Sequence, residues 1–218
     1  DFLPYYVCHN KKDEPKKSLK DCIRLCDEFI NNVNNNIQAD YYIGFLTMSK
    51  CFRYLVNSEY KGNRKYLQQP DYLNEVKDYL IVKHNFKYNT LYEADDLVLS
   101  FKTQNINKYN CIMISPDKDI LSLEGDHYNP KKNEFVKTSK EYAEDYFWKS
   151  MMIGDTADNI KGIKGIGPVG AEEIIKNNRL YVSLRQLVLE KYCEIYGEHV
   201  GISEFYKNYQ CLKIRDDI

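Results

Sequence analysis

Short apolar runs alternate with amphipathic helical segments along the first half of the chain. Residues 18–36, 72–83 and 93–101 carry apolar side chains at helical spacing, whereas 41–46 and 111–115 are short, mostly apolar runs typical of buried strands. This alternation predicts an α/β fold with a central, mainly parallel sheet flanked by helices. Ligands of such sheets bind beyond the carboxyl ends of the strands, so the residues that follow each run are the site candidates.

The pattern becomes helical from Ser139 to the end of the chain, interrupted by a glycine-rich turn. We therefore expect an α/β core over residues 1–138 and a helical region over 139–218. No apolar run approaches the roughly 20 residues of a membrane-spanning helix. The high apolar content, 43%, and the net charge of -1 exclude a disordered chain.

Seven carboxylates follow or precede the predicted elements in three groups: Glu93, Asp95 and Asp96; Asp117 and Asp119; Asp155 and Asp158. Any one group is explained by a helix dipole or a turn. Together at one sheet edge they would repel each other unless cations neutralised them, and hard oxygen ligands select Mg²⁺ or Mn²⁺. Because Mg²⁺ takes few protein ligands, the set predicts two or more ions, an arrangement that suits phosphodiester hydrolysis.

The seven cysteines are odd in number and scattered, which is typical of reduced cytosolic thiols. Cys22 and Cys26 share one helix face, but apolar neighbours continue that stripe and no histidine lies nearby. Core packing is therefore the better interpretation of this pair than a zinc site.

A glycine-rich turn at 159–171 precedes the helical segment 172–177. Gly165 and Gly167 permit a tight turn, and Pro168 suits the first position of a helix. The free amides at such a helix start bind a phosphate oxygen without reading a base. Flanking isoleucines and the basic residues Lys161 and Lys164 favour a helix-hairpin-helix phosphate binder over a plain connecting turn. A Rossmann site is disfavoured because no strand precedes the turn.

The acidic motifs at 93–96 (Glu-Ala-Asp-Asp), 115–119 (Ser-Pro-Asp-Lys-Asp) and 154–159 (Gly-Asp-Thr-Ala-Asp-Asn), followed by Gly-Ile-Gly-Pro at 165–168, resemble the 5′ nuclease (flap endonuclease) superfamily in order and spacing. The likeness is closest to the bacteriophage 5′-3′ exonucleases and the 5′ nuclease domain of bacterial DNA polymerase I. Tyr-Lys-Gly-Asn-Arg at 60–64 resembles the residues at the foot of the family's helical arch.

The resemblance implies a Mg²⁺- or Mn²⁺-dependent 5′-3′ exonuclease and flap endonuclease that acts by two-metal in-line attack of water on DNA. The implied metal ligands are Asp1, Glu93, Asp95, Asp96, Asp117, Asp119, Asp155 and Asp158. Catalytic roles fall to Lys61, Arg64, Asp117 and Asp155. The expected DNA contacts are Arg53, Tyr60, Lys61, Arg64, Lys161, Lys164, Gly165, Gly167, Val169 and Gly170.

The resemblance also implies an arch within residues 49–69 and DNA with a free 5′ end, a flap or a nick as partner. It further implies a monomeric protein that acts in DNA replication or repair, with a DNA polymerase as a possible partner. The expected location is the cytoplasm, or the cytoplasm of the host cell if the protein is phage-encoded.

Two features depart from the family pattern. The Asp that usually follows the second strand is replaced by Thr47-Met48, and Asp1 is either the first-strand ligand or the second acid of an Asp-x-Asp pair. The replaced Asp favours one alternative, a DNA-binding protein of the same fold with weakened catalysis. A second alternative is a PIN-type ribonuclease, against which the glycine-rich turn argues.

The net charge does not show how the acidic and basic residues are distributed along the chain. Without the seven carboxylates, 25 of the 32 acidic residues remain against 31 basic ones. The rest of the chain is then moderately basic, as a DNA-binding protein requires.

Overall fold

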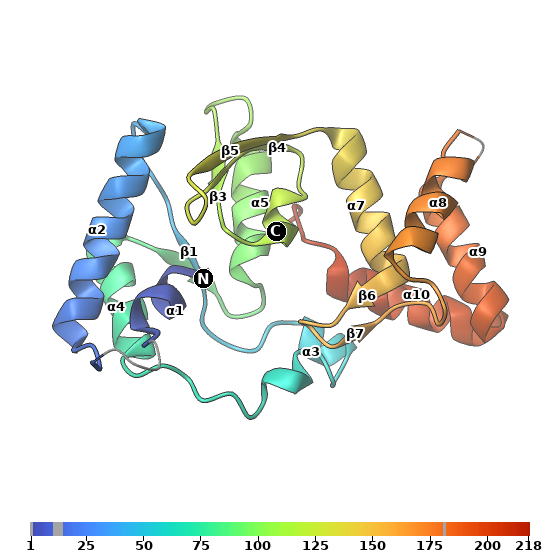
Figure 1. Cartoon of the computed structure of the whole chain (residues 1–218), viewed down its shortest axis with the longest axis horizontal. Coiled ribbons are helices and arrows are strands. Elements are labelled where there is room, and N and C mark those ends of the chain that lie inside the picture. The colour runs from blue at the N-terminus through green and yellow to red at the C-terminus, as the bar shows by residue number, and fades with distance from the viewer. Residues whose placement is uncertain (1, 11–14, 181) are drawn as a thin grey trace.

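A computed structural model describes residues 2–10, 15–180 and 182–218, and Figure 1 shows helices gathered at both ends of an elongated molecule. At the N-terminal end, α1 (Phe2–Cys8), α2 (Leu19–Ile37) and α4 (Leu73–His84) pack together. Ser18 caps α2 in a capping box with Asp21. Cys22 and Cys26 are buried in the core that these helices share, which confirms their prediction as packing residues.

Two separate sheets form in the α/β part. Strand β1 (Phe45–Thr47) pairs in parallel with β2 (Lys87–Asn89), and β3 (Ile112–Ile114) pairs in parallel with β4 (Gly125–Asn129). Strand β5 (Glu134–Thr138) joins β4 antiparallel. The parallel pairing is confirmed. The prediction of one central sheet is wrong for the described residues, because β1 and β3 do not pair and each spans only three residues.

Helix α5 (Ala94–Asn105) packs on β1 and β2, and α6 (Lys118–Leu121) follows β3 directly. The stretch proposed as an arch contains α3 (Arg53–Val56) and the short 3₁₀ turn η1 (Gly62–Arg64) before it reaches α4. In Figure 1 this stretch runs along the lower edge of the molecule and joins its two ends.

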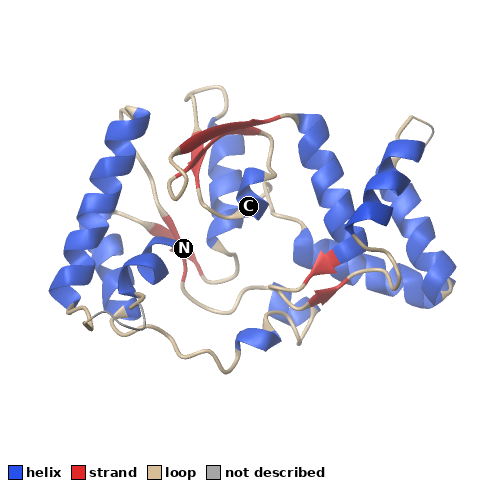
Figure 2. Ribbon diagram, viewed as in Figure 1, coloured by secondary structure: helices blue, strands red, loops and turns tan. Residues whose placement is uncertain are grey.

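The C-terminal end contains α7 (Lys140–Ile153), α8 (Pro168–Asn178), α9 (Leu184–Tyr196) and α10 (Glu198–Leu212). The small hairpin of β6 (Gly154–Asp155) and β7 (Ile160–Lys161) follows α7 and precedes α8 in the chain, and Figure 2 shows it below the lower end of α7. Trp148, Met151, Tyr192 and Phe205 lie in the core of these helices. Among the described residues, no helix is long and apolar enough to cross a membrane.

Candidate metal and nucleic-acid site

A cleft of about 800 Å³ opens between the α/β part and the C-terminal helices. Its acidic lining includes residues from the start of α5, the start of α6, and β6 with the turn that follows it, besides others from β4, α7 and the C-terminal residues. The acidic residues that line it are Glu93, Asp95, Asp119, Asp126, Asp155, Asp158, Glu124, Glu144 and Asp216. The three carboxylate groups predicted from the sequence therefore meet at one cleft, with Asp117 next to Asp119 at the cap of α6.

The start of α5 is fixed by hydrogen bonds to its first amides. Glu93 is the N-cap residue, and its backbone N–H donates to Asp96 Oδ2 over 3.1 Å. The amide of Ala94, between the predicted ligands Glu93 and Asp95, donates to Thr47 Oγ1 over 3.0 Å. Thr47, which stands where the family pattern has an Asp, thus holds the start of α5, with its predicted metal ligands, from the end of β1. Lys77 Nζ in turn donates to the Thr47 carbonyl over 2.7 Å.

Arg53 and Asp96 form a buried ion pair behind the cleft. The side chain of Arg53 is 3% exposed and donates to both oxygens of Asp96, over 2.6 and 2.7 Å. Asp96 also accepts from the amides of Glu93 and Arg215, so four hydrogen bonds occupy its two oxygens. Burial corrects the prediction for Arg53, whose side chain does not reach an exposed surface, and the hydrogen bonds show Asp96 anchoring Arg53 and α5. Metal ligation by Asp96 stays a prediction.

Tyr60 is buried as well, which corrects the prediction that its ring stacks on a base. Its hydroxyl lies 2.8 Å from Glu93 Oε2 and 2.9 Å from Asp158 Oδ2. Burial and these two carboxylates raise the pKa of the Tyr60 phenol, so the hydroxyl keeps its proton and shares it between them. Lys61 Nζ donates to Glu93 Oε1 over 2.5 Å and lies 3.8 Å from Asp158.

The segment that carries Lys61 docks on the turn after β6. The Lys61 amide donates to the Asp158 carbonyl over 2.9 Å, and Asn63 donates to the Thr156 carbonyl over 2.8 Å. Arg64 donates to the Ala157 carbonyl and, over 2.7 Å, to Asp158 Oδ1. These bonds bring two cations to the cleft edge, where Lys61 is partly buried and Arg64 is about half exposed.

The other four carboxylates have no ion pair within 4 Å in the part of the chain that the structure describes: Asp95, Asp117, Asp119 and Asp155. Burial, with repulsion from Asp117 and Glu93, raises the pKa of Asp95 to about 7. Burial, with repulsion from Asp117 and Asp155, raises the pKa of Asp119 to about 6. Tyr146 donates to Asp119 over 3.1 Å. These shifts mark a cluster of negative charge that the protein does not neutralise by itself.

The chemistry of this donor set fits hard divalent cations, because every candidate ligand is a carboxylate oxygen. Among the described residues, no three His, Cys, Asp or Glu side chains converge tightly enough to form a closed metal cage. Magnesium does not require such a cage, since it keeps several waters and takes one or two carboxylates. Asp1, predicted as a ligand, lies outside the described residues.

The glycine-rich turn is exposed and firmly anchored. Helix α8 begins at Pro168 after an N-cap at Gly167, which confirms the predicted helix start. Gly165 adopts a positive φ of 86°, as the tight turn requires. Beneath the turn, Tyr196 accepts from the Lys164 amide over 2.9 Å and donates to the Gly162 carbonyl. The predicted DNA contacts Lys161, Lys164, Gly165, Gly167 and Val169 are exposed, and Gly170 is partly exposed.

Sequence reasoning missed three contributors to the site. These are Thr47, which the sequence marks only as a departure from the family pattern, Tyr146, which it places only in a helical segment, and residues 213–218, which carry no motif. No local motif marks them, because each acts through a contact distant in sequence. Gly154 was visible in its motif: its φ is 81°, and a Cβ there would lie 2.4 Å from the Ile160 carbonyl oxygen. Only glycine therefore lets α7 end directly before Asp155.

No family model matches the chain. The chain is 38% identical to DNA polymerase I of Borreliella burgdorferi over 97 residues, which are 39% of this chain and 11% of the polymerase. It is 24% identical to the 5′-3′ exonuclease of Mycoplasmopsis pulmonis over 79% of this chain and 62% of that protein. The chain thus spans less than two thirds of these relatives.

Among solved structures, the bacteriophage T5 flap endonuclease in a pseudo-enzyme-product complex with DNA and metal ions matches with a TM-score of 0.66. The match covers 96% of each chain at 18% identity, so it shows that the two proteins share a fold.

Proposed function

We propose that this chain, a homologue of 5′-3′ exonucleases and flap endonucleases, is a divalent-metal-dependent nuclease that cuts DNA near a free 5′ end. The observation that carries the proposal is the division of the seven carboxylates. Among the described residues, Glu93, Asp96 and Asp158 are paired with Arg53, Lys61 or Arg64, and the other four have no cation within 4 Å. A purely structural acidic surface gives no reason for this division.

When the four unpaired carboxylates are all ionised, their charge is −4, which two divalent cations would neutralise. Asp95 and Asp117 would hold one ion, and Asp119 and Asp155 would hold a second, with waters completing each shell. Bound ions of this kind supply an activated water and stabilise the leaving oxygen in an in-line displacement. Mg²⁺ and Mn²⁺ are the ions that the all-oxygen donor set favours.

Lys61 and Arg64 provide the positive charge at the edge of the same cleft. Lys61 is held by Glu93, and Arg64 is held by Asp158 and the Ala157 carbonyl, so both cations are oriented before substrate arrives. A scissile phosphate entering the cleft would meet them opposite the unpaired carboxylates. Positioned donors of this type stabilise the charge that develops on a phosphate in the transition state.

The exposed turn at 164–170 would hold the duplex through its backbone amides, as a helix-hairpin-helix element of the helical region 139–218. The α/β core 1–138 would carry the chemistry. The stretch 49–69, which follows β1 and contains the docked segment 60–64, would act as the arch for the single strand. We propose a monomer that acts on flap or nicked DNA in replication or repair, beside a DNA polymerase.

A 5′-labelled flap DNA and an RNA of the same sequence, each incubated with Mg²⁺ or with EDTA, test this function. We expect Mg²⁺-dependent cleavage of the DNA near the flap junction. Binding of the flap without cleavage would support the alternative, a DNA-binding protein with weakened catalysis. The replacement of the family's Asp by Thr47 is the observation that favours this alternative. Preferential cleavage of the RNA would support the PIN-type ribonuclease.

A further inference from the structure

Residues 213–218, which we call the clasp, leave the end of α10 and return to α5, so that the C-terminus lies beside α5 in Figure 1. Three side chains of α5 at four-residue spacing bind it. Asp96 Oδ1 accepts from the Arg215 amide over 2.9 Å, and Ser100 and Gln104 both donate to a backbone oxygen of Ile218, over 2.5 and 2.7 Å. The side chains of α5 that bind the clasp therefore share one face of this helix, which also carries Asp95.

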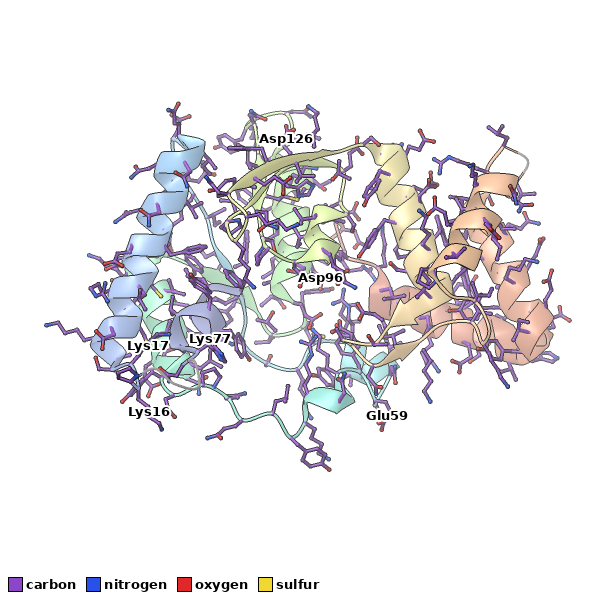
Figure 3. All side chains as sticks on the ribbon, viewed as in Figure 1. Lys16, Lys17, Glu59, Lys77, Asp96 and Asp126 are labelled. Carbon is purple, nitrogen blue, oxygen red and sulfur yellow. The ribbon has the colours of Figure 1, made fainter. Side chains whose placement is uncertain are left out.

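Arg53 joins the clasp to the same helix from the other side. Its Nε donates to the Cys211 carbonyl and its Nη2 to the Lys213 carbonyl, both over 2.9 Å, while its Nη atoms hold Asp96. Figure 3 shows Asp96 near the middle of the molecule. The guanidinium therefore uses its donors to fix the end of α10 and the start of α5 to one another, out of contact with water.

Helix α10 also holds the glycine-rich turn. Asn208, which is 1% exposed, donates to the Lys161 carbonyl over 2.7 Å, directly before the turn. Asn208 is less than one helical turn from Cys211. Helix α10 therefore connects two sets of buried hydrogen bonds, that of Asn208 to the residue before the turn and those of Arg53 to the end of α10 and to Asp96 at the start of α5.

We propose that the clasp and Arg53 have a positioning role. They keep the glycine-rich turn, which would bind the duplex, at a fixed distance from the carboxylates, which would bind the metals. This inference rests on the proposed function. Its physical basis is that a displacement of about 1 Å between a bound substrate and the reacting groups costs up to roughly a hundredfold in rate. Hydrolysis of a substrate too small to touch the turn does not depend on that distance.

Removal of Arg53 would leave Asp96 buried and uncompensated, so the test uses the milder double variant Ser100→Ala/Gln104→Ala. The matched control is Gln186→Ala/Ser203→Ala on exposed positions of α9 and α10. Two substrates are compared: 5′-flap DNA with Mg²⁺, and the small diester bis(p-nitrophenyl) phosphate with Mn²⁺. We expect flap cleavage to fall by roughly tenfold or more in the clasp variant. We expect hydrolysis of the small diester to stay equal to that of the control.

Hydrogen exchange in EDTA gives a second readout that needs neither metal nor activity. The clasp variant is expected to exchange faster at residues 213–215 and in α5 around Ser100 and Gln104, with the first turn of α5 and α9 unchanged. Equal losses on both substrates, unaltered flap cleavage, or unaltered exchange at α5 would each overturn the positioning role. A parent protein that cleaves no flap DNA would instead overturn the proposed function, and the exchange result would still decide whether the clasp fixes α5.

Discussion

The hydroxyl of Tyr60 lies between the carboxylates of Glu93 and Asp158, which come from α5 and from the turn after β6. One phenolic proton therefore links the α/β part to the C-terminal helices at the back of the cleft. Lys61 and Arg64 add positive charge to the same two carboxylates, so this side of the cleft is closed and neutralised without any metal.

Replacement of Tyr60 by Phe removes this proton and leaves two carboxylates close together with one fewer donor. Because hydrogen bonds to charged groups contribute about 1.5–3 kcal/mol each, we expect the free energy of unfolding to fall by about 2 kcal/mol. Denaturant unfolding in EDTA measures the loss. The control is Tyr66→Phe, at a side chain that is 89% exposed and expected to change stability little. A Tyr60→Phe protein as stable as the Tyr66→Phe protein would contradict the bridging role.

Lys61→Ala is expected to slow flap cleavage by about a hundredfold, the usual effect of removing one positioned donor from a transition state. The matched control is Lys65→Ala, because Lys65 is exposed and has only a ring contact with Tyr66. Single-turnover rates with saturating enzyme separate the chemical step from DNA binding. Equal rates in the two variants would show that Lys61 serves only to neutralise Glu93.

The raised pKa values of Asp95 and Asp119 make the metal-free protein sensitive to pH. Between the unfolded pKa of 3.8 and the folded pKa of about 7, the folded state binds more protons at Asp95 than the unfolded state does. Its contribution to stability therefore falls as pH rises through this window, and Asp119 adds a smaller effect up to about 6. Thermal unfolding in EDTA at a series of pH values should show this decline.

Mg²⁺ should reverse the trend, because protons and cations compete for the same carboxylates and binding to the folded state stabilises it. We expect the gain in melting temperature on adding Mg²⁺ to grow from pH 5 to pH 7.5. The Asp95→Asn variant should be less dependent on pH in EDTA and gain less from Mg²⁺. A gain that is independent of pH would argue against these carboxylates as the metal site.

Thr47→Val keeps the shape of the side chain but removes the oxygen that accepts from the Ala94 amide. We expect it to cost about 1 kcal/mol, as loss of a helix cap does, and Thr47→Ser to be nearly neutral because it keeps the oxygen. Metal affinity, measured by calorimetry with Mn²⁺, should weaken in the Val variant and hold in the Ser variant. The opposite order would show that the threonine methyl group, through packing, is what matters at this position.

Much of the secondary structure could be predicted because it is local. The spacing of Leu19, Cys22, Cys26 and Ile30 predicts α2, and Pro168 marks the first residue of α8, both as observed. The β4–β5 hairpin could not be predicted, since Gly-Asp-His-Tyr-Asn at 125–129 is too polar to indicate a strand. Its formation depends on pairing with β3, a contact that no local pattern records.

The candidate site, like the fold, could be predicted from the sequence only in part. Acidic motifs after strands predict that carboxylates gather at one edge, and the cleft contains them. Sequence cannot tell which of them are already neutralised, because Arg53 and Asp96 are 43 residues apart and Arg64 and Asp158 are 94 apart. The polar side chains of Tyr60 and Arg53 likewise suggest residues that contact DNA. Only the fold shows that both are buried.

The most direct test of a metal-dependent nuclease with its site at the unpaired carboxylates is the single-turnover rate of Mg²⁺-dependent 5′-flap cleavage. It compares the parent with Asp155→Asn, which removes one negative charge without changing side-chain size. We expect the parent to cut the flap and the variant to be slower by about a hundredfold or more while it binds the flap with equal affinity in EDTA. Cleavage by the variant at the parent's rate would contradict the assignment of the site.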